Sequence, residues 1–373
     1  MNSVFSSIKK ESLEICGSRC KQILQDLVEN IKISPSLTIG YKNYEPLEVA
    51  SNLQAYLNKG TLLHRNQYLA AKLQGYIYHI FCTEFGAEIN SDSKEIDDAG
   101  LEDEGDREPA TNYVKKWSRT KFYQQLTQNN YGQGYSDYDW SVTAQNDNDW
   151  QVIKNGLTLH IDPQKHLLES LAALPLGAKV AIKMPSNLVE HGKYIAVGDA
   201  GSATVAGSSR NTVTTQLYFN VSAEGAVILL KQLTQKLNSI RVPFDFSIAY
   251  SEMAFDSPDA AVLDFQKCDF EQVNPLIQSI YQQSQAYFKE GMLFFCKPLA
   301  SGWGLAEKPV VPKFEQENIG QHYSGAIAKI LIETWQQKKL GCSDRFDAML
   351  DALAKRGINP HCLYLNPDSI DVY

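Results

Sequence analysis

The chain has 373 residues, of which 43% are hydrophobic and 21% are charged, so it can bury the core of one large domain or two modest ones. Its formal net charge of -8 argues against nucleic acid or an anionic membrane as the main partner, because both select a basic surface. The seven cysteines are scattered without zinc spacing, and neither a signal sequence nor a long apolar span occurs, so we expect a cytoplasmic protein with free thiols and no bound metal.

Residues 1–89 are predicted to form a helical N-terminal region. Apolar side chains recur at steps of three and four residues over 1–33, 44–57 and 66–85, which is the period of an amphipathic helix. The last of these segments is rich in tyrosine and phenylalanine. Aromatic residues at helical spacing pack into a core far more often than they bind a cofactor, so we assign them to the core.

Residues 90–110 are predicted to be a linker or loop, because nearly all are acidic or small and they show no apolar period. A tail that competes for a basic site is the alternative. The remaining chain, 111–373, is assigned to one α+β domain. It opens with a helical pattern over 111–128 and continues through 129–140, where glycines, asparagines and aromatics are typical of turns.

Two predicted strands carry the first candidate site residues. Each strand alternates apolar and polar side chains, as expected when one face of a sheet is buried and the other is wet. The polar side of 157–161 holds His160, and the polar side of 179–184 holds Lys179 and Lys183.

The segment 214–264 is predicted to form the centre of the domain. It alternates as a strand, continues into a helix capped by Ser222, and returns through two further strands before another helix. This β-α-β-β-α order predicts a mixed or antiparallel sheet with helices packed on one face. The opposite face is polar, and a functional site is expected there; its residues are Gln216, Tyr218, Asn220, Asp245 and Ser247.

The rest of the chain is predicted to be mainly helical. Helical patterns cover 269–288, 324–337 and 343–356. A stretch punctuated by glycine and proline around Trp303 is predicted to be an ordered loop.

Several strings between residues 131 and 373 resemble the HopA-type effector family in their order and spacing. They are KNGLTLHI, VAIKMPSNLVEHGKYIAVGDAG, LYFNVSAEGAV, VPFDFSIAY, DAAVLDF, FFCKPLASGWGLAEKP and LYLNPDSIDVY. The family is a class of type III secretion effectors, and its bacterial relatives include the lyase component of some lanthipeptide synthetases.

The resemblance implies a lyase chemistry, the β-elimination of phosphate from phosphoserine or phosphothreonine in a peptide. This reaction needs a base, a proton donor for the leaving phosphate and cations that hold the dianion, but no cofactor. His160 and Lys183 match a histidine and a basic residue of the family and become the catalytic candidates, although a surface histidine and a solvated lysine are the alternatives. The residues expected to bind substrate are Lys179, Arg210, Gln216, Tyr218, Asn220, Ser247 and Lys297.

The sequence also departs from the family pattern. Basic residues are usual where this chain has Gln216, Ser247, Ser257 and Tyr323. Each lost charge-assisted hydrogen bond would cost about 1.5–3 kcal/mol of phosphate binding.

Two functions therefore stay open at this point. An active lyase of peptide tailoring predicts a basic pocket in which His160 and Lys183 converge. A catalytically impaired relative that binds a peptide or protein partner predicts a neutral or acidic groove. The partners expected are a peptide or protein substrate, such as a precursor peptide, and a kinase or a paralogous lyase, with no nucleic acid and no membrane. An effector that acts on a host pathway is a third possibility, which follows from the family resemblance alone.

Overall fold

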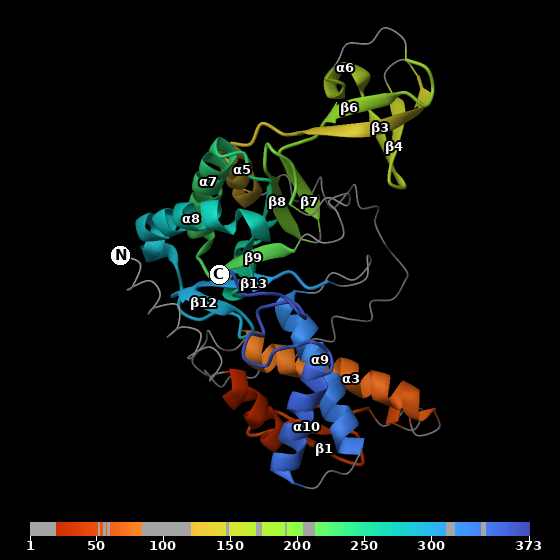
Figure 1. Ribbon diagram of the computed structural model, residues 1–373, viewed down its shortest axis with the longest axis vertical. Helices are drawn as coiled ribbons and strands as arrows, with labels where there is room; N and C mark the ends of the chain where they lie inside the picture. The colour runs from red at the N-terminus through yellow and green to blue at the C-terminus, as the bar shows by residue number, and fades with distance from the viewer. Residues whose placement is uncertain are drawn as a thin grey trace. The chain divides into compact units, whose positions relative to one another are not determined.

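A computed structural model describes residues 20–50, 53–54, 57, 60–83, 121–146, 149–168, 174–190, 192–203, 213–310, 318–336 and 341–373. The chain divides into two compact units, one made of Met1–Asn90 with Glu290–Tyr373 and the other of Ser91–Lys289. Both contain helices and antiparallel strand pairs, which confirms the predicted α+β fold class (Figure 1). The domain limits predicted from the sequence stay a prediction, because the acidic segment 90–110 lies outside the described residues.

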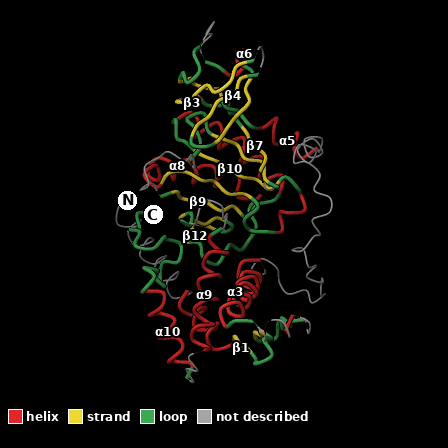
Figure 2. The backbone as a smooth tube through the Cα atoms, turned by 90° about the vertical axis from the view of Figure 1, so that its right-hand side faces the viewer, coloured by secondary structure: helices red, strands yellow, loops and turns green. Residues whose placement is uncertain are grey.

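The unit Ser91–Lys289 contains a central antiparallel sheet. Its strands are β7 (Asn187–Glu190), β8 (Lys193–Val197), β9 (Thr214–Phe219), β10 (Phe244–Ala249) and β11 (Ala261–Gln266). Within this unit they pair in the order β7-β8-β10-β11-β9, as Figure 2 shows for the run from β7 through β10 to β9. The same unit contains the helical elements α5 (Lys121–Asn129), α7 (Ala223–Ser239), α8 (Phe270–Ser284), η3 (Glu252–Asp256), η4 (Lys267–Asp269) and η5 (Gln285–Tyr287).

Local sequence explains the order of these elements. Ser222 caps α7 by accepting a hydrogen bond from the N–H of Gly225 at 3.1 Å. A Cβ at Gly225 would lie 2.6 Å from the Cβ of Tyr287, so only glycine fits where the helix starts. Phe219 of β9 packs edge to face on Phe288, which follows η5, with ring centroids 6.2 Å apart. The predicted β-α-β-β-α order and the packing of helices on the phenylalanine side are confirmed.

The same unit contains a four-stranded sheet that the sequence patterns predicted only in part. Its order is β5-β4-β3-β6, with β3 (Ser136–Gln145), β4 (Trp150–Lys154), β5 (Leu157–Ile161) and β6 (Lys179–Lys183); the one-turn helix α6 (Pro163–His166) follows β5. Trp140, Val142 and Val152 belong to a core cluster of this sheet. The turn predicted over 129–140 is thus replaced in its last five residues by the start of β3, because tertiary packing of Trp140 overrides the local preference for a turn.

The unit formed by Met1–Asn90 and Glu290–Tyr373 is mostly helical. Residues 20–30 form a helix, and the named elements are β1 (Ile31–Ile33), β2 (Ile39–Tyr41), α3 (Leu62–Tyr78), the π-helical turn η1 (His79–Thr83), β12 (Lys297–Ala300), β13 (Trp303–Glu307), α9 (Ile319–Gln336) and α10 (Cys342–Ala354). Helices α3 and α9 lie side by side in both views (Figures 1 and 2).

Three predictions about this unit are wrong in detail. The first helix ends at residue 30 because the next three residues pair with β2, and residues 44–50 are not helical. The expected loop around Trp303 is the hairpin β12-β13, in which the whole of β13 is buried.

Of the helices in the described ranges, none combines the length and the apolar composition that a membrane span requires.

Candidate functional site

The predicted polar side of the central sheet exists, and its side chains form a hydrogen-bonded network. Cross-strand register aligns Gln216 with Asp264, and Asp264 with Asp245, on neighbouring strands. Tyr218 donates its hydroxyl to the Gln216 amide oxygen at 2.8 Å, and the Gln216 amide nitrogen donates to Asp264 at 3.0 Å. We call the surface formed by these four residues and Ser247 the polar face.

Most of the polar face is buried. The exposed fractions of Gln216, Asp245 and Asp264 are 8%, 6% and 7%, and that of Tyr218 is 2%. Side chains directly opposite each other in an antiparallel pair lie about 4.5–5.5 Å apart at Cβ, so the two aspartates place their carboxyl groups side by side. Like charges in this arrangement are unfavourable unless donors surround them, and the Gln216 amide is one such donor.

Two residues outside the predicted set border this face. Ser202, which follows β8, donates its hydroxyl to Asp245 at 2.6 Å. Burial raises the pKa of the Tyr135 phenol, and the negative charges of Asp137 and Asp245 raise it further. Local sequence carries no signal for either residue, because the chain reaches Asp245 from two distant segments only after folding.

The remaining central candidates have structural surroundings. Asn220 is 6% exposed, and its backbone carbonyl accepts the N–H of Lys289 at 2.8 Å. Ser247 is half-buried and lies between Ile195 and Val262 in register. Arg210 lies outside the described residues.

The two predicted catalytic residues do not meet. His160 lies on β5 and Lys183 on β6, the two edge strands of the four-stranded sheet, with β4 and β3 between them. Three strand spacings of about 4.8 Å separate them by roughly 14 Å across the sheet alone, and the register places them at opposite ends of β3 as well, because His160 aligns through Gln151 with Ala144 whereas Lys183 aligns with Ser136. Their separation is far beyond hydrogen-bond reach. Both side chains are exposed on the polar side of the sheet, as predicted, but the strand order prevents the expected convergence.

His160 and Lys179 of this sheet contact different acceptors. The His160 ring contacts Asp149 at 3.1 Å, and both side chains are more than half exposed. Lys179 donates to the carbonyl of Asp139 at 3.1 Å. Such solvated pairs contribute little to stability and do not organise a site.

Lys297 belongs to the other unit, where it is a buried cation. Its side chain is 3% exposed, and its ammonium contacts Asp371 at 3.2 Å and the carbonyl of Tyr373 at 3.1 Å. The Tyr364 ring lies 5.2 Å away. Burial by itself raises the pKa of Asp371, but the hydrogen bond from Tyr364 and the charge of Lys297 outweigh it and hold this pKa below the ordinary value. In this conformation the lysine has no access to a substrate.

Comparison with known proteins agrees with the resemblance in the sequence. A family model described as the HopA1 effector protein family matches residues 184–365. This part of the chain belongs to the HopA1 effector protein family. No curated protein matches the chain.

Two solved structures are similar to the chain, each over 81% of this chain and 96% of the other. The effector protein from Pseudomonas syringae pv. tomato strain DC3000 shares 13% identity with a TM-score of 0.42. The effector protein from Pseudomonas syringae pv. syringae strain 61 shares 11% identity with a TM-score of 0.40.

The HopA1 match begins one residue after β6. The four-stranded sheet therefore precedes the matched residues, and so do His160, Lys179 and Lys183, whereas the polar face lies within them. Ser257 and Tyr323, where basic residues were expected, are also within the match. The Ser257 hydroxyl donates to Asp259, and the Tyr323 hydroxyl donates to the carbonyl of Leu365.

Chemically, the polar face of this HopA1 region offers carboxyl, amide and hydroxyl groups. Such a set hydrogen-bonds peptide groups and attracts cations, whereas phosphate dianions are bound by arginine, lysine or arrays of N–H donors. Among the described histidine, cysteine, aspartate and glutamate residues, no three lie close enough together to hold a metal ion.

Proposed function

We propose that this chain is a non-catalytic relative in the HopA1 effector protein family that binds a peptide or protein partner. The partner segment presents a basic or neutral polar side chain to the margin of the polar face. This margin is formed by Ser202, Ser247 and Tyr135, which are half-buried.

The proposal rests on the two hydrogen bonds that the Gln216 side chain makes within the polar face. The Gln216 amide donates to Asp264 and accepts from Tyr218, so both ends are engaged inside the sheet. The resemblance implies an arginine at this position in an active lyase. Here a neutral amide bonded to a carboxylate takes its place, and a phosphate dianion brought to this face would be repelled by Asp264 and Asp245.

The separation of His160 and Lys183 supports the same conclusion. A general acid and a base must both reach the reacting atoms within about 3 Å, directly or through one water. Residues on opposite edges of a four-stranded sheet do not do so.

The test compares one peptide with and without phosphate on its threonine. We incubate the full chain with the phosphothreonine peptide and look for loss of phosphoric acid by mass spectrometry. We also measure binding of both peptides by fluorescence anisotropy, using sequences that contain lysine near the threonine. The expected result is no dehydrated product and no gain in affinity from the phosphate.

A dehydrated product that disappears in the Lys183→Ala and His160→Ala variants would reverse the conclusion in favour of a lyase. The double variant Gln216→Arg with Ser247→Lys provides the matched control. It returns two cations to the polar face, so it should bind the phosphopeptide more tightly than the natural chain does.

A further inference from the structure

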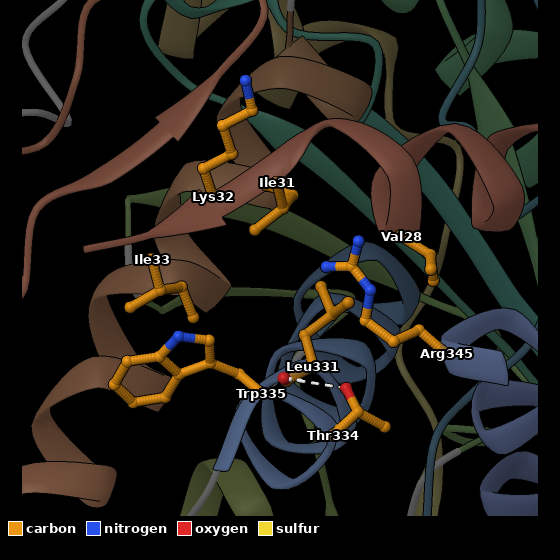
Figure 3. Close-up of a pocket in the computed structure, with 8 residues that line it drawn as sticks. All are labelled: Val28, Ile31, Lys32, Ile33, Leu331, Thr334, Trp335 and Arg345. Atoms are coloured by element: carbon orange, nitrogen blue, oxygen red, sulfur yellow. Dashed lines mark hydrogen bonds between the residues drawn. The ribbon is translucent and has the colours of Figure 1, made fainter. Parts of the chain in front are cut away.

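A cavity of about 210 Å³ lies in the unit Met1–Asn90 with Glu290–Tyr373, whereas the polar face and the four-stranded sheet belong to the unit Ser91–Lys289. The cavity is open to solvent on one side and is lined by the end of the helix over residues 20–30, by β1, by α9 and by Arg345 of α10 (Figure 3). We call it the Arg345 cavity.

The wall of the Arg345 cavity is apolar and aromatic. Val28, Ile31, Ile33 and Leu331 supply aliphatic surface, and the indole of Trp335 lies beside Ile33 (Figure 3). An apolar cavity of about 150 Å³ is large enough for benzene, so this one has room for a single ring and one small polar group.

One charge faces this apolar space. The guanidinium of Arg345 points between Val28 and Ile31, whereas the ammonium of Lys32 points away from the cavity, as the alternation along β1 requires (Figure 3). Among the residues that the structure describes, the buried Nε atom of Arg345 has no hydrogen-bond acceptor, and Nη2 donates to the sulfur of Cys342 at 3.4 Å. Within the described ranges no carboxylate forms an ion pair with Arg345.

A buried guanidinium nitrogen without an acceptor is costly, and a bound carboxylate removes this cost. Arginine and carboxylate match geometrically, since two parallel N–H groups meet two oxygens. We propose that the Arg345 cavity binds a small organic carboxylate whose apolar part is about the size of one aromatic ring. Arg345 holds the carboxylate, and the aliphatic residues with Trp335 hold the ring.

Phenylacetate is a suitable probe, and isothermal titration calorimetry of the full chain measures it directly. Its uncharged amide, phenylacetamide, and the cation phenethylamine keep the ring and change only the polar group. Phenylacetate should bind saturably at one site per chain, the amide should bind more weakly, and the amine should not bind.

Variants separate this site from general charge effects. Arg345→Gln should weaken phenylacetate binding about 10-fold to 100-fold, the equivalent of a lost charge-assisted hydrogen bond. Lys32→Gln is the first control, because it removes a neighbouring cation whose ammonium points away from the cavity. Arg356→Gln removes a different arginine, which lies just beyond α10, is exposed and pairs with Glu333. Both controls should keep the affinity of the natural chain.

The proposal is wrong if phenylacetate shows no saturable binding to the natural chain, if the amide binds equally well, or if folded Arg345→Gln binds equally well. Circular dichroism checks the fold of each variant. Should Arg345→Gln not fold, Ile33→Trp decides, because the much larger indole takes up the space of the ligand ring without removing a charge. That variant must lose binding for the proposal to stand.

Discussion

Replacing Lys297 by methionine should destabilise the protein by about 3 kcal/mol, the lower end of the range for removing one partner of a buried ion pair. The lysine side chain is 3% exposed, while that of Asp371 retains 19% exposure, so water partly screens the carboxylate that is left behind. Methionine keeps the stem volume, and the loss therefore reports the ammonium contacts with Asp371 and the Tyr373 carbonyl.

Urea unfolding measures this change as a lower midpoint with an unchanged slope. The double variant Lys297→Met with Asp371→Asn should recover part of the loss, because it no longer contains an unpaired buried charge. A Lys297→Met protein as stable as the natural chain, but with weakened peptide binding, would refute the structural role and return Lys297 to the predicted substrate-binding set.

Three further predictions concern stability. Tyr218→Phe removes the hydroxyl that donates a hydrogen bond to Gln216 and should lower the free energy of unfolding by about 1 kcal/mol, measured by chemical denaturation. An unchanged midpoint would show that this hydrogen bond adds nothing to stability. Ser222→Ala removes the cap of α7 and should cost about 1 kcal/mol, whereas Ser239→Ala at the other end of the helix, which caps no N–H, should cost less. The lowered pKa of Asp371 contributes stability that is complete above the ordinary aspartate pKa of about 3.9 and disappears as pH falls through the lower folded value. Asp371→Asn should therefore make unfolding less dependent on pH in this acid range, and an unaltered pH profile would contradict the assignment.

Periodicity in the sequence was enough to predict the strands and the helix of the central segment, residues 214–264. Alternation in β9 and β10, the cap at Ser222 and the apolar stripe of α7 all act over a few residues, so their signal is present in the local sequence. The assignment of Gln216, Tyr218, Asp245 and Ser247 to one side of a sheet was correct for this reason. The strands β3 and β13 were missed, because the serine and aspartates at the start of β3 and Gly304 in β13 are typical of turns and conceal strands that only distant packing stabilises.

Tertiary structure decided which side chains meet. The alternation of polar and apolar residues predicts that His160 and Lys183 both lie on the polar side of their strands. No local pattern encodes the strand order, and this order puts the two residues on opposite edges of one sheet. Register brings Asp245 against Asp264, although 19 positions separate them in sequence. Burial of Lys297 against Asp371 likewise depends on contacts across more than 70 residues, a separation over which only the folded chain brings opposite charges together.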